Sequence, residues 1–283
     1  MGKIKKMKPL DLLFSVIQYV MLIGASIIAL LPVVVCILTA FKTNEEYATT
    51  SVLDLPASWA YVENFIVAFQ KANMGRCFLN TFIVLIVVLF LSIMFSSMLG
   101  YILNRFRFKG HGIIDNLFTF ASLIPGIATQ VTVYQIMYNL GLINHLYGYI
   151  IVLCGTDIIS IYIFLQFFEN LPVSLDESAI LDGASYFGVF FKILFPLLKP
   201  AIVTSCILKG VSVYNEYYMS NLYLQSKELK TISTALYTFT GPYGNQYNYI
   251  CAGVIITIIP ILVVFLLCQR QIYGGLAAGA VKG

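Results

Sequence analysis

Three ionisable residues stand inside otherwise apolar stretches of this 283-residue chain. Asp157 and Lys209 are isolated, whereas Glu216 lies in the polar run 214–221, which reads Tyr-Asn-Glu-Tyr-Tyr-Met-Ser-Asn. Aromatic rings can cover the faces of a sugar while amides and carboxylates bind its hydroxyl groups, so this run suits a neutral polyol. The same groups could instead hold helices together, or Glu216 could pair with Lys209 two turns earlier on one helix face. The candidate residues for lining a passage are Asp157, Tyr214, Asn215, Glu216 and Tyr218.

A second acidic group opens the segment 171–200. Ser174 precedes Glu177 by three residues, the spacing of a helical capping box, with Ser174 as the N-cap. Apolar residues then recur at helical steps of four and three, which predicts one apolar helix face made of Ile180, Ala184, Phe187, Phe191 and Leu194. We expect Gly183 to bend this helix or to admit another backbone, and Pro196 and Pro200 to end it.

This segment is too long to be an ordinary connector. Connections between bundled helices usually have about 2–8 residues. A helix lying on a membrane surface usually carries Lys and Arg on its polar face, whereas this one leads with Asp176, Glu177 and Asp182. The pattern favours docking into a groove on a partner protein.

The chain lacks the residue sets of most enzymes. It contains no G-x-x-x-x-G-K-[ST] phosphate loop, so it has no evident means of binding ATP by itself. Its two histidines, His111 and His145, are expected on opposite sides of a membrane and could not share a metal. The six cysteines are scattered without a C-x-x-C pair and are expected to be buried apolar residues. We therefore predict that the protein is not an enzyme and holds no metal or cofactor.

The composition identifies the elements that must position these residues. Hydrophobic residues make up 59% of the chain and charged residues 11%, and the mean hydropathy is +0.87. Soluble domains carry about 25% charged residues, so a soluble enzyme is nearly excluded. Long apolar runs predict an all-α, polytopic membrane protein with six transmembrane helices near 12–40, 78–103, 113–137, 148–168, 201–222 and 250–269. Pro125 and Pro260 are expected to kink the third and sixth of them.

Lys and Arg predict the orientation of these spans. With six spans both termini share a side, and that side holds eleven of the 17 basic residues. The positive-inside rule therefore places both termini in the cytoplasm. The net charge of +4 follows from this asymmetry, and no basic, aromatic-studded face indicates a nucleic-acid partner.

Two motifs resemble a known family. Residues 176–184, Asp-Glu-Ser-Ala-Ile-Leu-Asp-Gly-Ala, followed by Ile-Leu-Phe-Pro at 193–196, are similar to the "EAA" loop of ABC importer permeases. Ser178 and Phe195 depart mildly from that pattern, at positions where the family has Ala and Leu. The ending Gly-Leu-Ala-Ala-Gly-Ala-Val-Lys-Gly at 275–283 resembles the tail of the maltose-type G subunit, which belongs to the carbohydrate-importing branch.

The resemblance covers essentially the whole chain and implies a type I importer permease fold. It implies a cytoplasmic N-terminus (1–11), a permease domain (12–270) with a coupling loop (171–200) and an outer loop (223–249), and a cytoplasmic tail (271–283). In such a protein the ATPase contacts come from the coupling loop and the tail, and the outer loop meets a sugar-loaded binding protein. The residues implied are Asp176, Glu177, Ala179, Asp182, Gly183 and Ala184 in the coupling loop, Gly279, Ala280 and Lys282 in the tail, and Gly241, Pro242, Tyr243 and Asn245 in the outer loop.

The resemblance also implies partners and a mechanism. The partners are a homologous second permease, a cytoplasmic ABC ATPase dimer that binds ATP and Mg, an extracytoplasmic sugar-binding protein, and the lipid of the bacterial cell (inner) membrane. ATP binding would close the ATPase dimer and move the coupling helix, and the paired permeases would rock from inward-open to outward-open. Two other interpretations stay open from the sequence: an ion-coupled secondary transporter, and a membrane scaffold that does not transport.

Overall fold

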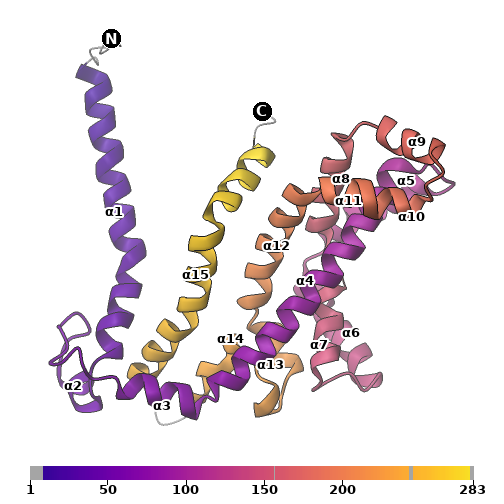
Figure 1. Ribbon diagram of the computed structural model, residues 1–283. Coiled ribbons are helices and arrows are strands. Elements are labelled where there is room, and N and C mark those ends of the chain that lie inside the picture. The colour runs from indigo at the N-terminus through magenta and orange to yellow at the C-terminus, as the bar shows by residue number, and fades with distance from the viewer. Residues whose placement is uncertain (1–8, 156, 242–244, 281–283) are drawn as a thin grey trace. The chain divides into compact units, whose positions relative to one another are not determined.

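The computed structural model describes residues 9–155, 157–241 and 245–280, and the side chains of 9–13 and 270–280 lie outside this description. Over these residues the protein is built from helices, without strands. Three helices are long and apolar enough to cross a membrane, or up to six if each of three bent pairs counts as one span. The described chain divides into two compact units, residues 1–72 with 236–259, and residues 73–235 with 260–283. Figure 1 shows the elements.

The first unit contains the long helix α1 (Pro9–Ala40), the short helices α2 (Asn44–Thr49) and α3 (Glu63–Lys71), the 3-10 turn η3 (Leu236–Phe239), and the start of α15 (Tyr247–Ala280). A buried polar network holds their ends together. The Asn64 amide donates to the carbonyls of Ala40 and Lys42, both at 2.8 Å, and the Asn248 amide donates to Asn64 at 3.1 Å. The fully buried Lys42 ammonium donates to the Ser51 carbonyl and to the Thr50 hydroxyl.

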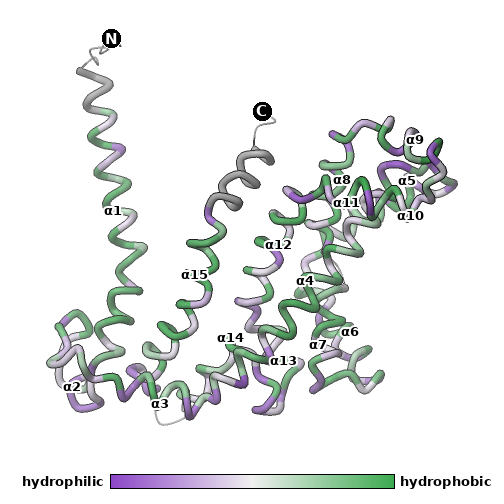
Figure 2. Tube along the Cα trace, in the orientation of Figure 1, coloured by the Kyte–Doolittle hydropathy of each residue, from purple (hydrophilic) through white to green (hydrophobic). Residues whose placement is uncertain are grey.

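The second unit is organised around α4 (Met74–Arg105). Helix α8 (Ile158–Glu169) packs along it, and the two approach closely at Gly100, where a Cβ atom would lie 3.0 Å from the Cβ of Phe164. Helix α12 (Lys199–Tyr214) packs against both. Apolar residues dominate the middle of α4 and α8 (Figure 2), which accords with burial against neighbours on one side and with lipid on the other.

Three expected spans are broken rather than continuous. The third was expected to be one kinked helix, but it forms α5 (His111–Leu123) and α6 (Gly126–Asn139), bent by 102°. Pro125 has no amide hydrogen and forces Ile124 into an extended conformation, with φ −79° and ψ 119°, so the helix ends there. The expected fourth span forms α7 (Leu146–Cys154) and α8, separated at Gly155 and Asp157.

The expected fifth span ends early. Helix α12 stops at Tyr214, and a short helix α13 (Tyr218–Tyr223) follows. The Glu216 carboxylate accepts a hydrogen bond of 2.9 Å from the Met219 amide at the start of α13. Glu216 therefore does not share a helix face with Lys209, and the alternative in which these two residues pair is wrong. The remaining short elements of this unit are η2 (Lys227–Leu229) and α14 (Ile232–Ala235).

Candidate functional site

Residues 171–200, which we call the coupling segment, form two short helical stretches joined by a turn. Helix α9 (Ser174–Leu181) is followed by α10 (Tyr186–Val189), the π-helical turn η1 (Phe190–Leu194) and α11 (Phe195–Leu197). The predicted capping box is wrong, because Ser174 is the first helical residue and the N-cap is Val173, which makes no side-chain cap. The Ser185 hydroxyl does cap α10, accepting from the Gly188 amide at 3.2 Å.

Gly183 makes the turn between α9 and α10. Its φ of +86° is left-handed, a conformation that glycine adopts without a steric penalty. The Gly183 amide donates to the Ile180 carbonyl and the Ala184 amide to the Ala179 carbonyl, each at 2.9 Å, which is the Schellman pattern of a helix C-terminus. A Cβ atom on Gly183 would meet nothing within 4 Å. The expected bend is confirmed, and this residue is open to a partner.

The single apolar face expected for the coupling segment is divided in the structure. Ile180, Phe187 and Phe191 of that face are exposed, Phe187 by 67%, whereas Leu194 is buried. The turn at Gly183 and the π-helical turn after Val189 each change the helical register, so a single period cannot run through the segment. The buried residues are Ala179, Val189, Phe190, Leu194 and Leu198.

An acidic and apolar surface is left uncovered at the turn. Glu177, Asp182 and Gly183 are exposed, and beside them Leu181 is 88% exposed. Exposed acidic and apolar side chains therefore lie next to one another at this turn. Ala184 is half-buried beside them.

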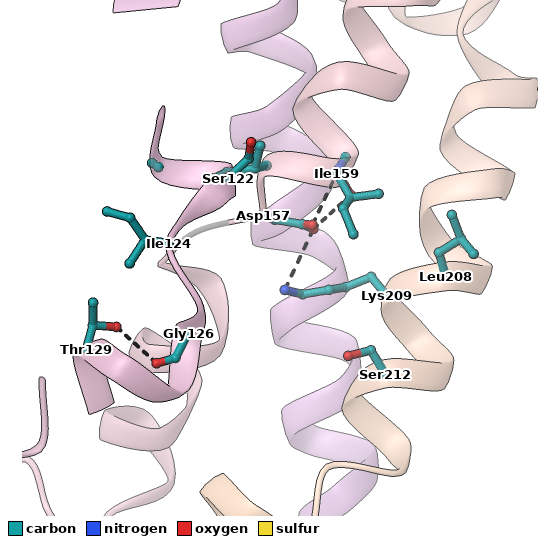
Figure 3. Close-up of a pocket in the computed structure, with 12 residues that line it drawn as sticks. Ser122, Ile124, Gly126, Thr129, Asp157, Ile159, Leu208, Lys209 and Ser212 are labelled. Carbon is teal, nitrogen blue, oxygen red and sulfur yellow. Dashed lines mark hydrogen bonds and ion pairs between the residues drawn. The ribbon is translucent and has the colours of Figure 1, made fainter. Parts of the chain in front are cut away.

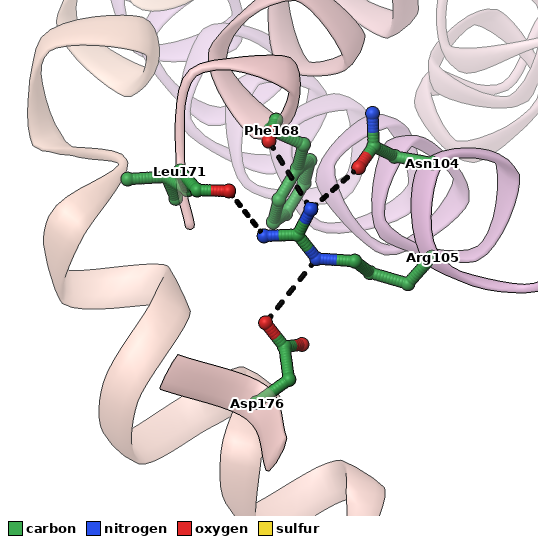
Figure 4. Close-up of polar contacts among 5 residues, drawn as sticks. All are labelled: Asn104, Arg105, Phe168, Leu171 and Asp176. Atoms are coloured by element: carbon green, nitrogen blue, oxygen red, sulfur yellow. Dashed lines mark hydrogen bonds and ion pairs between the residues drawn. The ribbon is translucent and has the colours of Figure 1, made fainter. Parts of the chain in front are cut away.

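Asp176 and Ala179, both expected to contact a partner, instead face the interior of this chain. Ala179 packs in the core beneath α9. The Asp176 carboxylate lies 3.2 Å from Nε of Arg105, and each side chain is only 8% exposed. Figure 4 shows that the Arg105 guanidinium also reaches Asn104, Phe168 and Leu171. Sequence spacing gave no signal for this ion pair, because the partners are 71 residues apart.

A pocket of about 550 Å³ lies at the breaks in the third and fourth expected spans. It is lined by α5, α6, the start of α8, and α12, and Figure 3 shows nine of its labelled residues. Asp157 projects into it beside the Lys209 ammonium, at 3.7 Å. Its other polar residues, which sequence reasoning missed, are Ser122, Thr129, Ser160 and Ser212. Single hydroxyl residues in apolar helices carry too weak a signal to be singled out.

The polar run 214–221 does not line this pocket. Tyr214 and Glu216 are half-buried, whereas Asn215 and Tyr218 are exposed. The Asn215 amide bonds its own helix at the Val211 carbonyl, and the Glu216 carbonyl accepts from the Ser233 hydroxyl. The structure therefore brings Asp157 together with Lys209 and separates them from the tyrosine-rich run.

The outer loop 223–249 falls in both units. In the second unit, the buried Asn80 amide near the start of α4 donates to the carbonyls of Glu228 and Lys230, at 2.8 and 3.0 Å. In the first unit, the Asn245 amide donates to the Tyr247 hydroxyl at 2.9 Å, and Gly241 is exposed. Pro242 and Tyr243 lie outside the described residues.

The tail is described only in part. Gly279 and Ala280 are the last two residues of α15, and Lys282 lies outside the described residues. Among the residues that are described, no group of three or more His, Cys, Asp or Glu side chains could hold a metal ion.

Comparison with known proteins identifies the family. Residues 4–273 match the model of the binding-protein-dependent transport system inner membrane component. The arabinooligosaccharides transport system permease protein AraQ of Halalkalibacterium halodurans is 32% identical over 273 residues, covering 95% of this chain and 98% of AraQ. The melibiose/raffinose/stachyose import permease protein MelC of Bacillus subtilis is 29% identical, covering 89% of this chain and 91% of MelC.

A solved structure shares the fold. It is the crystal structure of a bacterial ABC transporter involved in the import of the acidic polysaccharide alginate, with a TM-score of 0.83 and 19% identity, covering 94% of this chain and 99% of that one. The expected all-α importer-permease fold is thereby confirmed. The chain belongs to the family of binding-protein-dependent transport system inner membrane components, and it is a permease subunit of an ABC importer.

Proposed function

We propose that this permease imports a sugar or oligosaccharide that an extracytoplasmic binding protein delivers. The relatives AraQ and MelC are named for the transport of arabinooligosaccharides and of melibiose, raffinose and stachyose. One structural observation carries the proposal. Helix α4, about 48 Å long at 1.5 Å per residue, holds the outer loop at its first turns through Asn80 and the coupling segment at its last turn through Arg105. A single helix thus joins the coupling segment to the part of the outer loop around Glu228 and Lys230.

The coupling segment is the proposed seat of a separate ATPase dimer, which binds ATP and Mg. Glu177, Asp182 and Gly183 would contact it together with the exposed Leu181, and Ala184 would lie at the edge of this contact. Because Asp176 and Ala179 are buried, their part would be to hold α9 in place. Gly279, Ala280 and Lys282 of the tail would add a second contact between the ATPase domains.

The pocket at the broken helices is the proposed part of the passage in this subunit. An ion pair and four hydroxyl side chains offer donors and acceptors without net charge, which suits a neutral polyol. Broken helices are tolerated at membrane depth where they line a cavity or are buried in protein. Tyr214, Asn215, Glu216 and Tyr218 would lie further along the same route.

The proposed cycle begins when the loaded binding protein meets the outer loop at Gly241, Pro242, Tyr243 and Asn245. ATP binding closes the ATPase dimer and moves the coupling segment. The chain and its homologous partner permease then rock from inward-open to outward-open. Coupling between two sites requires a rigid element whose position both sites influence. In this proposal both termini lie in the cytoplasm, as the distribution of Lys and Arg supports, and the complex lies in the bacterial cell membrane.

The test is reconstitution of the whole complex. This chain would be co-expressed with a homologous permease, an ABC ATPase and a sugar-binding protein from the same organism, purified, and placed in liposomes. We expect co-purification of the ATPase and ATP hydrolysis that rises on addition of the sugar-loaded binding protein. The matched control carries an ATPase whose phosphate-loop lysine is replaced. Sugar uptake that persists with this control and follows an ion gradient would contradict the proposal.

A further inference from the structure

Arg105 occupies a junction of three elements in the second unit. It is the last residue of α4, and its guanidinium is buried. Nε donates to the Asp176 carboxylate in the first turn of α9, and Nη2 donates to the Leu171 carbonyl at 2.8 Å. Nη1 donates to the Asn104 side chain at 2.9 Å and to the Phe168 carbonyl at 3.4 Å. One planar side chain therefore binds α4, the end of α8 and the start of α9 at the same time (Figure 4).

The positions of these partners suit a cation. Phe168 lies in the last turn of α8 and Leu171 two residues beyond the end of that helix, where carbonyls lack partners within the helix and the helix dipole is negative. Asp176 lies in the first turn of α9, where the dipole favours a carboxylate. The fork of the guanidinium satisfies acceptors in several directions, which the single ammonium group of lysine cannot do.

Aromatic packing continues the same junction one turn earlier on α4, on the face that also carries Arg105. The Tyr101 ring lies 5.7 Å from that of Phe168 and 5.5 Å from that of Phe190, measured between centroids. Phe106, the residue after Arg105, contacts Tyr186 of α10 with centroids 5.2 Å apart. The coupling segment is thus fixed to α4 by an ion pair at α9 and by rings at α10 and η1.

We propose that Arg105 is the positioning residue that transmits movement of the coupling segment to α4 and α8. This inference rests on the proposed function. When an ATPase moves α9, Asp176 carries the guanidinium with it, because separation would leave two buried charges unpaired. The guanidinium in turn moves the end of α8 and the whole of α4, and α4 extends to the segment that Asn80 holds at the opposite end.

The test uses the reconstituted complex with two variants of the pair and one matched control. Arg105→Lys keeps the positive charge but removes the fork, and Asp176→Asn keeps the shape but removes the negative charge. Arg107→Lys makes the same change two residues away on an exposed side chain. The measurements are co-purification of the ATPase, basal ATP hydrolysis, stimulation by the sugar-loaded binding protein, and sugar imported per ATP.

We expect both variants of the pair to assemble and to keep basal hydrolysis, while stimulation and sugar per ATP fall roughly three- to thirty-fold. The double variant should be no worse than either single one, Asp176→Glu should restore part of the coupling, and Arg107→Lys should resemble the wild type. A purely structural role would lower assembly and basal activity together with stimulation.

Two results would overturn the inference. One is wild-type coupling in both Arg105→Lys and Asp176→Asn, and the other is loss of assembly in both, which would make the pair a folding element only. Failure of the proposed function is distinguishable from these, because the wild-type complex itself would then show no stimulation by any loaded binding protein.

Discussion

Lys209 of α12 and Asp157 at the start of α8 face each other across a break in a membrane-depth helix, with ammonium and carboxylate 3.7 Å apart. Lys209 also donates a hydrogen bond of 2.9 Å to the Leu153 carbonyl near the end of α7. Asp157 accepts from the Ser160 hydroxyl at 2.8 Å. A cation therefore stabilises the end of α7 and an anion the start of α8, as the helix dipoles favour. The pair therefore stabilises the break between α7 and α8, and both of its residues line the pocket.

Removal of one member of this pair should destabilise the protein more than removal of both. Lys209→Met leaves the Asp157 carboxylate, only 10% exposed, without its cation. Loss of one partner of a buried pair costs about 3–5 kcal/mol, and access of water to the pocket should reduce that cost. The measurement is thermal unfolding of the purified chain in detergent for Lys209→Met, Asp157→Asn and the double variant. A double variant as unstable as the sum of the singles would contradict this account, and Lys199→Met, an exposed site on the same helix, is the control.

Substitution of Gly183 should uncouple transport from ATP hydrolysis. A side chain at its φ of +86° costs about 1–2 kcal/mol of backbone strain, and no atom of this chain lies near enough to clash. Gly183→Val should therefore insert in the membrane normally, while the branched side chain disturbs the ATPase contact. Transport and hydrolysis would be compared with Gly112→Val, another glycine with open space but without a positive φ. Normal sugar uptake by Gly183→Val would count heavily against the assignment of the coupling segment.

Substitutions of two leucines in the coupling segment should distinguish an effect on ATPase docking from an effect on folding. Leu181 is 88% exposed, so Leu181→Ala should leave the melting temperature unchanged and reduce co-purification of the ATPase. Leu194 is fully buried, so Leu194→Ala should cost about 2–5 kcal/mol of stability. Melting and co-purification would be measured side by side. An unchanged yield of ATPase with Leu181→Ala would show that this surface is not the docking site.

The reactivity of single cysteines should show which residues line the passage. In a background without the six native cysteines, Ser212→Cys in the pocket should react with a water-soluble thiol reagent in at least one nucleotide state of the complex. Val88→Cys, at a fully buried position of α4, should not react. The same reagent applied to cysteines at 214–218 tests whether the polar run lies on the route. Absence of reaction at Ser212→Cys and at 214–218 in every state would exclude the passage proposed for this subunit.

The long apolar helices could be predicted from the sequence. The predictions were wrong where a break ends a helix early or a turn changes the helical register. The bounds of α1 and α4 follow from unbroken apolar runs of the length that a bilayer requires. The break at Pro125 is larger than a kink because the proline and the extended residue before it both end the helix. The single apolar face predicted for the coupling segment divides into exposed and buried residues because Gly183 and the π-helical turn change the helical register.

Polar contacts between residues far apart in the sequence could not be predicted from the sequence either. Asp176 was singled out as part of a motif, but its pairing with Arg105 depends on how α4 and α8 end beside each other. Lys209 was noticed as an unusual charge, yet its partner is Asp157 from another helix rather than Glu216 from the same stretch of chain. Periodicity describes one helix at a time, so it cannot identify a partner that tertiary packing supplies.

The most direct test of the central claim is a structure of the purified, lipid-embedded complex with nucleotide bound. The account predicts that the turn at Leu181, Asp182 and Gly183 is buried in a cleft of a nucleotide-binding subunit, with Arg105 and Asp176 still paired behind it. A complex that transports sugar while this turn contacts only lipid or water would contradict the account.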